Sequence, residues 1–274
     1  MHTQFYLIKP LSNLHVGSGD VSFGVVDNLI QRDVLNNLPN INSSSLKGAI
    51  REFCKYSELE TFEKIFGSDT ESDKKTKGSF RFFDANILAI PVRSEKMPYL
   101  MATSISILNE FIYKVRQFGI TASYSDKVQR LVNAIGKVEH KQPIVFTKQL
   151  ENAVIEELDY KAALKEIEDL SALENLIGSN IVILSDDNMH LICDNNHLPV
   201  IARNHLENGI STNLWYEQVL PRYTRLYFAV VGYEQADFKD FDIKIQESPV
   251  SIGANASIGY GYCKIEKLEY DENK

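Results

Sequence analysis

Cysteine, tryptophan and long apolar runs are scarce in this sequence, and each scarcity argues against a class of protein. The three cysteines, Cys54, Cys193 and Cys263, are odd in number and far apart, so they predict neither a disulfide framework nor a zinc knuckle. No apolar run approaches the roughly 20 residues that span a bilayer. The first segment, MHTQFYLIKPL, does not have the pattern of a signal peptide. We therefore expect a protein of the reducing cytoplasm with no membrane partner.

Several catalytic signatures are also missing from the sequence. It contains no ordinary P-loop, no GxGxxG dinucleotide fingerprint after a first strand, no GxSxG and no HExxH. His190, His197 and His205 lie close together, but they flank predicted strands and no cysteine pair completes a metal site with them. The sequence thus lacks the motifs of the common nucleotide-binding, hydrolase and zinc-protease classes.

The composition is otherwise that of an ordinary globular chain. Its 274 residues, 44% hydrophobic and 24% charged, suffice for one large domain or two small ones. The formal net charge of −8 taken alone argues against nucleic acid, because phosphate binding requires lysine and arginine. The acidic residues, however, cluster in residues 151–174 and in the C-terminal YDENK, whereas KGSFRFF and KVEHKQP are basic. A local basic groove is therefore compatible with the total charge.

The order of the predicted elements indicates an α+β fold. Aromatic and β-branched runs predict strands in QFYLIKPL, GSFRFFDANILAIPV (two segments around a turn at residues 84–86), NIVILSDD, RLYFAVVGY and the segment after the last glycine loop. Helical spacing predicts helices in SSSLKGAIREFCKY, in SISILNEFIYKVRQFG and in the acidic stretch of residues 150–176. Asn208-Gly209 predicts a β-hairpin, because both residues tolerate a positive φ.

Two groups of side chains are candidates for binding an anionic or aromatic ligand. Lys47, Arg51 and Lys55 are spaced four residues apart and form one basic stripe on the first predicted helix. A solvated helix face is the simpler explanation of that stripe. Trp215 and Tyr216 follow the predicted hairpin turn, where they can either stack on bases or pack the base of the hairpin.

Glycine-rich loops hold the remaining candidates. In IGANASIGYGY, Gly253, Gly259 and Gly261 would permit a close approach of the backbone to a ligand. His15 lies in the loop LHVGSGD and can serve as a general base, although a lone loop histidine more often makes only local hydrogen bonds. Asp27, in SFGVVDNLIQRD, is a turn residue, a surface charge or the one group that performs chemistry.

The order of these motifs is more specific than any one of them. A glycine loop after the first strand, SSLKGAIR, PVRS, NLWYEQVLP and IGANASIGYGYCKI follow one another. Together they resemble the RAMP superfamily of CRISPR-associated proteins, and within it the repeating backbone subunit of type III-B effector complexes. GVVDNLIQRD and LWYEQVLP are particular to that subunit, whereas the glycine loop and SLKG are shared across the family. Ala254 and Ser257 depart from the family pattern, which leaves a close backbone contact at Ala254 open.

The resemblance implies a fold and a set of partners. The fold would be a ferredoxin-like, RNA-recognition-type core with helical insertions and a protruding β-hairpin thumb. A single RAMP domain would span residues 1–274, with the thumb at about residues 199–220 and a mainly helical insertion at about residues 103–178. The implied partners are CRISPR guide RNA, complementary target RNA, copies of the same chain in a filament and other Cmr-type subunits.

The resemblance also assigns roles to individual residues. Asp27 matches the residue that cleaves target RNA, either by accepting the proton of a 2′-hydroxyl or by holding a divalent metal, Mg or Mn. Glu217 matches an auxiliary residue near the same point, and His15 is carried over with less weight. The residues expected to contact RNA are Lys47, Arg51, Arg93, Trp215, Tyr216, Gly253, Gly259 and Gly261.

Three other functions stay open on the sequence. The first is a backbone subunit that binds guide RNA without cutting. The second is a stand-alone RAMP endonuclease that processes the guide precursor, which would depend on a histidine base and not on a metal. The third is a generic RNA-binding protein that acts as a monomer with strong salt dependence.

Overall fold

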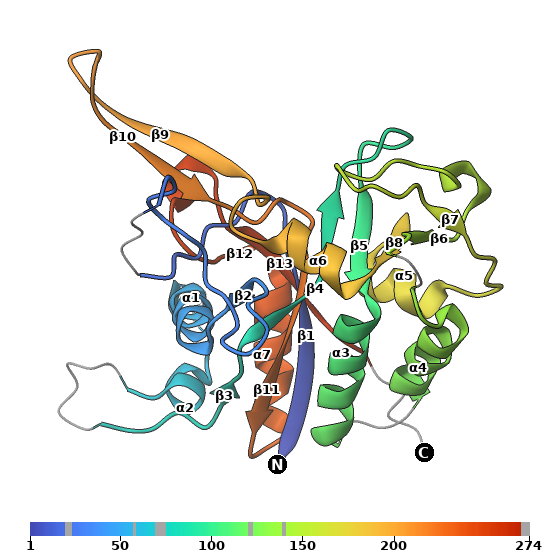
Figure 1. Ribbon diagram of the computed structural model, residues 1–274. Helices are drawn as coiled ribbons and strands as arrows, with labels where there is room; N and C mark the ends of the chain where they lie inside the picture. The colour runs from blue at the N-terminus through green and yellow to red at the C-terminus, as the bar shows by residue number, and fades with distance from the viewer. Residues whose placement is uncertain (20–23, 57–58, 69–74, 120–122, 139–140, 270–274) are drawn as a thin grey trace. The chain divides into compact units, whose positions relative to one another are not determined.

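The computed structural model describes residues 1–19, 24–56, 59–68, 75–119, 123–138 and 141–269 (Figure 1). Part of the predicted first glycine loop and the whole of the YDENK tail lie outside these residues. The chain divides into two compact units. The single RAMP domain that the resemblance implies for residues 1–274 stays a prediction. The first unit contains residues 1–86, 195–223 and 227–267, and the second contains residues 87–194 and 224–226 with the C-terminal end. One boundary falls inside strand β4 (Ala85–Val92) and one inside strand β11 (Arg225–Gly232), whereas another lies between helix α6 (Asp186–Cys193) and strand β9 (Val200–Glu207).

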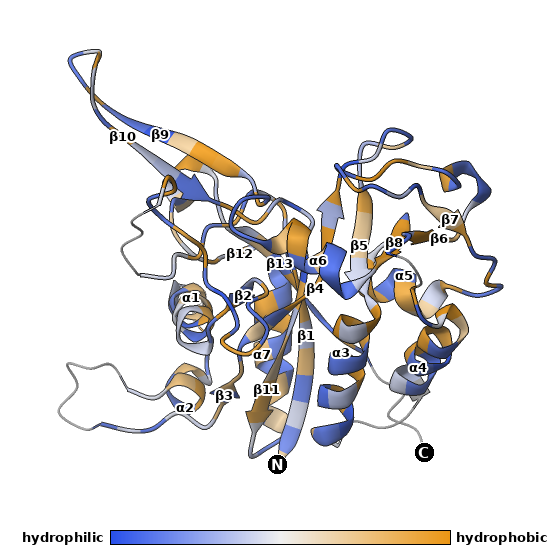
Figure 2. Cartoon of the chain, viewed as in Figure 1, coloured by the Kyte–Doolittle hydropathy of each residue, from blue (hydrophilic) through white to orange (hydrophobic). Residues whose placement is uncertain are grey.

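The first unit is built on a sheet centred on β1 (His2–Pro10). β1 pairs antiparallel with β13 (Tyr262–Lys267), and β13 pairs antiparallel with β12 (Val250–Ser251). On its other side β1 lies next to β11 (Arg225–Gly232), which pairs with β3 (Arg81–Phe82). β2 (Asn40–Ile41) pairs with the first residues of β4 (Ala85–Val92). β11 is coloured as hydrophobic along most of its length in Figure 2 and is buried from its second residue onward.

The described helical elements of the first unit are α1 (Ser43–Tyr56), α2 (Phe62–Phe66), α7 (Ala236–Glu247) and the short 3₁₀ helix η2 (Ala256–Ile258). The apolar spacing predicted for α1 is present, with Leu46, Ile50 and Cys54 fully buried. At the start of this helix the Ser43 N–H donates to the Asp84 carboxylate at 2.6 Å, so a distant side chain satisfies one of the free N–H groups. All three cysteines are free and buried, and burial raises the thiol pKa of Cys54 and Cys263 to about 12.

A separate two-stranded sheet belongs to the first unit. β9 (Val200–Glu207) and β10 (Ile210–Gln218) pair antiparallel and form the long hairpin at the upper left of Figure 1. Their turn residues, Asn208 and Gly209, have φ angles of 53° and 81°, as the sequence predicted for an Asn-Gly hairpin. The hairpin is exposed along most of its length and becomes buried only at its base, at Glu217 and Gln218.

The second unit contains a mixed sheet. β4 pairs antiparallel with β5 (Leu100–Ser104), which is parallel to β8 (Ile181–Leu184). β6 (Ile144–Val145) pairs antiparallel with β8 and parallel with β7 (Ala163–Leu164). The helical elements are α3 (Ile105–Gln117), α4 (Ser123–Ile135), α5 (Ser171–Ile177), α6 (Asp186–Cys193) and the short 3₁₀ helix η1 (Lys148–Leu150).

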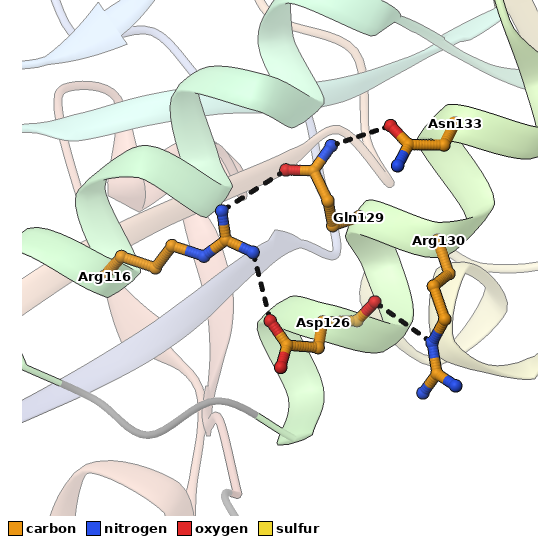
Figure 3. A network of polar contacts seen from close by, with 5 residues as sticks. All are labelled: Arg116, Asp126, Gln129, Arg130 and Asn133. Atoms are coloured by element: carbon orange, nitrogen blue, oxygen red, sulfur yellow. Dashed lines mark hydrogen bonds and ion pairs between the residues drawn. The ribbon is translucent and has the colours of Figure 1, made fainter.

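α3 and α4 are linked by polar side chains (Figure 3). Arg116 on α3 forms an ion pair with Asp126 on α4 at 3.0 Å, and Gln129 and Asn133 on α4 are joined at 3.2 Å. α3 begins at an N-cap, because the Ser104 side chain accepts the Ile107 N–H. Among the described residues no helix combines the length and the apolar character needed to cross a membrane.

The helix predicted for residues 150–176 is wrong for most of its length. Only α5, at the end of the stretch, is an α-helix, so helices fill only part of residues 103–178. The backbone N–H groups of this stretch are used elsewhere: Ala163 donates to the Pro143 carbonyl at 2.8 Å and so contributes to β7. Glu156 has a φ of 46°, which a right-handed helix does not allow. Pairing with distant strands has overridden local helix propensity here.

Candidate active site

Asp27 lies on the surface of the first unit, where its loop runs beside β10. The N–H groups of Asp27 and Asn28 both donate to the Tyr216 carbonyl oxygen at 3.1 Å, and the Tyr216 N–H donates to Asp27 Oδ2 at 2.7 Å. The Gln218 N–H donates to the Asn28 carbonyl oxygen at 2.9 Å. The loop and the hairpin strand therefore form a short parallel bridge, and backbone groups fix the orientation of the Asp27 carboxylate.

The two carboxylate oxygens of Asp27 have different environments. Oδ2 accepts the Tyr216 N–H, which is the local capping role that the sequence left open for this residue. Oδ1 accepts no hydrogen bond from any residue that the structure describes, and the side chain is exposed. An exposed oxygen with a fixed orientation can accept a proton from a bound hydroxyl or contact a cation. Capping uses Oδ2 and leaves Oδ1 available for another contact.

Glu217, one residue after Tyr216, is only 6% exposed. Trp215 Nε1 donates to Glu217 Oε1 at 2.9 Å, and Asn28 Nδ2 donates to the same oxygen at 3.4 Å. Asn255 Nδ2 donates to Oε2 at 2.7 Å, and Arg203 Nη1 lies 4.0 Å from Oε2. The protein itself occupies both oxygens of this carboxylate.

His15 is also buried, at 4% exposure. Its Nδ1 lies 2.6 Å from the Gln218 carbonyl oxygen, and because a carbonyl only accepts, Nδ1 is the protonated nitrogen of this contact. The His15 carbonyl oxygen accepts the Ala254 N–H at 2.9 Å. His15 thus joins the first loop, the end of β10 and the C-terminal glycine loop.

The glycines of the last loop approach backbone closely, but the neighbour is the chain itself at two positions. Gly253 (φ 83°) and Gly261 (φ 73°) pack so that an added Cβ would overlap the carbonyl oxygens of His15 and Ile252. Gly259 (φ 86°) has no atom within 4 Å of an added Cβ. Of the three, only Gly259 offers open space in which a ligand could approach the backbone.

Part of the basic stripe on α1 is used for contacts within the protein. Arg51 Nη1 donates to the Phe66 carbonyl oxygen at 3.1 Å, and the guanidinium lies 5.1 Å from the centre of the Phe62 ring, so Arg51 braces α2. Lys47 is half-buried, and burial, followed by the positive charge of Arg51, lowers its pKa. Lys55 is exposed at the end of the helix. An anion beside Lys47 would stabilise its charged form and so oppose this lowering of the pKa.

Arg93 belongs to the second unit. Its Nε and Nη2 both lie 2.9 Å from Glu156 Oε2, and its backbone N–H also donates to this side chain. The Glu156 carboxylate raises the pKa of Arg93, first through these hydrogen bonds and then through its charge. The Arg93 side chain is 81% exposed, so an RNA phosphate could replace Glu156 as its partner.

The two aromatic residues at the base of the hairpin differ in accessibility. Trp215 is half-buried, its ring nitrogen is bonded to Glu217, and Arg203 lies 5.8 Å from its ring. Trp215 therefore packs the base of the hairpin, which is the simpler of the two roles that the sequence allowed. Tyr216 is 37% exposed, and its ring remains available for stacking.

Sequence reasoning missed the partners of Glu217. These partners lie far from Glu217 along the chain: 189 positions for Asn28, 14 for Arg203 and 38 for Asn255. None of them belongs to a recognisable motif. The one available signal was the place of Asn255 in a glycine-rich loop: its φ of 68° is left-handed, which asparagine tolerates better than most residues.

Comparison with known proteins agrees with this architecture. The model of the RAMP superfamily matches residues 7–264. The CRISPR system Cmr endoribonuclease Cmr4 of Pyrococcus furiosus is 29% identical, over 96% of this chain and 95% of that protein. The CRISPR system CMR subunit Cmr4 of Saccharolobus solfataricus is 29% identical over 70% and 64% of the two chains.

Solved structures share the fold. A chain of the type III-B Cmr-beta bound to cognate target RNA superposes with a TM-score of 0.77 at 21% identity, covering 97% of each chain. A crystal structure of Cmr4 gives a TM-score of 0.70 at 22% identity, with 98% of this chain and 99% of that one covered. The family model spans nearly the whole chain, and the chain therefore belongs to the RAMP superfamily.

Proposed function

We propose that this chain is the repeating backbone subunit of a type III-B CRISPR effector complex, and that it cleaves target RNA through Asp27. The observation that carries the proposal is the fixed, exposed carboxylate of Asp27 at the base of the β9–β10 hairpin. The proposal is supported by the Pyrococcus furiosus relative, a Cmr endoribonuclease that aligns with 96% of this chain.

The partners of this chain would be guide RNA, complementary target RNA, further copies of the chain and other Cmr-type subunits. One related structure is that of an oligomeric Cmr4, and another holds cognate target RNA, which supports both kinds of partner. In this assignment the sheet of the first unit is the ferredoxin-like core, and the hairpin is the thumb that enters the guide–target duplex. Lys47, Arg51 and Arg93 would contact the guide backbone, which fixes position and leaves sequence recognition to base pairing.

The chemistry follows from the geometry of Asp27. A target nucleotide unstacked beside the hairpin would place its 2′-hydroxyl next to the adjacent phosphate. Asp27 Oδ1 accepts the hydroxyl proton as the 2′-oxygen bonds to phosphorus, and the bond from phosphorus to the 5′-oxygen breaks. The leaving oxygen takes a proton from water, so the products are a 2′,3′-cyclic phosphate and a 5′-hydroxyl. One carboxylate suffices because Tyr216 fixes its orientation.

The expected cofactor is a divalent metal, Mg or Mn. The described residues contain no group of three His, Cys, Asp or Glu side chains that could hold a metal. As the alternative to accepting the proton, Asp27 would be a protein ligand of this metal, and RNA phosphate oxygens and water would complete the coordination shell, as is common for magnesium. When bound, the metal would offset the negative charge that develops on the phosphate.

An end-labelled target RNA complementary to a defined guide tests the proposed function. Complexes assembled with this chain are expected to give evenly spaced products in magnesium and none in chelator. A 2′-deoxy substitution at one cut position should abolish that cut alone. A complex that binds guide and target but yields no products would make this chain a scaffold. Cutting that persists in chelator and depends on His15 would instead indicate a stand-alone type of RAMP endonuclease.

The salt dependence of guide binding tests the role of Lys47. The Lys47→Gln chain is expected to bind all guide sequences more weakly, because a phosphate contact carries no sequence information. The slope of log affinity against log salt should fall by about 0.7, the value for one contact to a single strand. Lys264→Gln is the matched control, since Lys264 is already paired with Glu266 at 2.6 Å. An unchanged slope in Lys47→Gln would remove Lys47 from the guide-binding surface.

A further inference from the structure

Three segments that are distant in sequence meet at the carboxylate of Glu217. Asn28 comes from the loop that carries Asp27, Arg203 and Trp215 come from the hairpin, and Asn255 comes from the C-terminal glycine loop. We call these four residues together with Glu217 the Glu217 network. In this network, side chains from all three segments contact one common carboxylate.

A buried carboxylate with both oxygens bonded to protein is poorly placed for chemistry on RNA. Glu217 Oε1 has two donors and Oε2 has one, besides the cation 4.0 Å away, and the residue is 6% exposed. To take a proton or hold a metal, Glu217 would have to abandon these partners and leave them unsatisfied in a buried place. Asp27 Oδ1, in contrast, accepts no hydrogen bond from any described residue and could bind RNA or a cation without losing a protein partner.

Arg203 supplies the charge that makes this burial tolerable. Its guanidinium lies over the ring of Trp215 and over that of Tyr260, 5.8 Å and 5.9 Å from their centres. Arg203 Nη1 makes no hydrogen bond in the described structure, so its contribution to Glu217 is a charge at 4.0 Å and not a directed contact. The directed contacts come from the neutral donors of Asn28, Trp215 and Asn255, and these define the geometry.

Asn28 connects the Glu217 network to Asp27, the candidate catalytic residue. Its side chain donates to Glu217, its N–H donates to the Tyr216 carbonyl oxygen, and its carbonyl oxygen accepts the Gln218 N–H. The adjacent residue along the chain is Asp27. A shift of Asn28 would therefore move the carboxylate of Asp27, and a displacement of about 1 Å can cost on the order of 10²-fold in rate.

We propose that Glu217 is a positioning residue, which with Asn28 and Asn255 sets the place of Asp27 relative to the hairpin. This inference rests on the proposed function of Asp27. It gives Asp27 and Glu217 different roles, whereas the sequence grouped them as a catalytic residue and its auxiliary. It also names Asn255, in a loop near the C-terminal end of the chain, as a determinant of cleavage.

Glu217→Gln distinguishes positioning from chemistry. The glutamine Oε1 still accepts from Trp215 and Asn28, and Asn255 can turn its amide so that Oδ1 accepts from the new Nε2. Cleavage by assembled complexes is expected to stay within about threefold of wild type, with the same half-saturating magnesium concentration. Glu217→Ala removes every contact and is expected to lose on the order of 10²-fold while guide binding persists. Glu247→Gln, at an exposed carboxylate outside the hairpin, controls for the change of charge.

Exchanging the donor and the acceptor tests the hydrogen bond between Asn255 and Glu217 directly. Asn255→Asp would set two carboxylates against each other at the present 2.7 Å contact, so one of them must take up a proton to restore a hydrogen bond. Its cleavage rate relative to wild type is expected to fall as pH rises. The double variant Glu217→Gln, Asn255→Asp restores a donor opposite an acceptor and is expected to recover the wild-type pH profile.

Amide hydrogen exchange gives a readout that does not require cleavage. The amide of Asn28 is expected to exchange faster in Glu217→Ala and at the wild-type rate in Glu217→Gln. Failure of the wild-type complex to cut RNA would overturn the proposed function of Asp27, while this exchange result would still decide whether Glu217 holds the loop. The inference is overturned if Glu217→Gln is as inactive as an Asp27 variant with normal guide binding, if the double variant is not rescued, or if Asn28 exchange does not respond to Glu217→Ala.

Discussion

Replacing Asp27 with asparagine is expected to lower the rate of target RNA cleavage by about 10²- to 10⁴-fold while guide binding is retained. Asparagine has the same shape as aspartate, and its carbonyl oxygen can still accept the Tyr216 N–H that now bonds to Oδ2. The loop should therefore keep its place beside β10. What is lost is the charged oxygen that accepts the 2′-hydroxyl proton or contacts a divalent metal.

Single-turnover cleavage with excess complex measures this effect without a contribution from product release. Asp33→Asn is the matched control, because Asp33 lies six residues further along and uses its carboxylate only locally in the described structure. Its Oδ1 accepts the N–H groups of Leu35 and Asn36 at 2.8 Å and 3.1 Å. Wild-type cleavage by Asp27→Asn would mean that Asp27 is a loop residue and that the activity lies elsewhere.

Gly253→Ala is expected to destabilise the chain by about 3 kcal/mol or more. A left-handed φ costs an alanine roughly 1–2 kcal/mol, and the new Cβ would also overlap the His15 carbonyl oxygen. That oxygen accepts the Ala254 N–H, so the backbone cannot relax without breaking this bond. Because His15 is bonded to Gln218 at the base of the hairpin, the change should also reduce cleavage.

Gly259→Ala separates the cost of a left-handed φ from the cost of the overlap with the His15 carbonyl oxygen. Its φ of 86° is nearly that of Gly253, but no atom lies within 4 Å of an added Cβ. Only the conformational cost of roughly 1–2 kcal/mol is expected there. Denaturant unfolding of the two variants beside wild type measures the difference. Equal destabilisation would show that the close approach of Gly253 to His15 contributes nothing to stability.

The elements that could be predicted from the sequence are those with a strong local signal. The Asn208-Gly209 turn has the positive φ angles that its residue types favour, and the apolar spacing of Leu46, Ile50 and Cys54 matches the buried face of α1. The acidic stretch of residues 150–176 misled prediction because its backbone pairs with β6 and with residues 93–95, which lie outside the stretch. Local propensity contains no information about such partners.

The same distinction applies to the candidate site. Asp27 could be found because a resemblance marked its loop, although the residue alone is a common type of loop carboxylate. The assembly of the Glu217 network depends on contacts such as that of Asn28, 189 positions from Glu217. Burial of Glu217 is likewise a property of the folded chain. The sequence therefore identified the residue, and only the structure distinguished its environment from that of Asp27.

The most direct test of this account is an assembly made from mixtures of wild-type and Asp27→Asn chains. If each subunit carries its own cleaving carboxylate, each cut in an end-labelled target RNA should decline in linear proportion to the fraction of variant chains. The spacing of the remaining cuts should not change. Cuts that persist when every chain is Asp27→Asn, or that vanish together at a small fraction of variant, would contradict one cleaving aspartate per subunit.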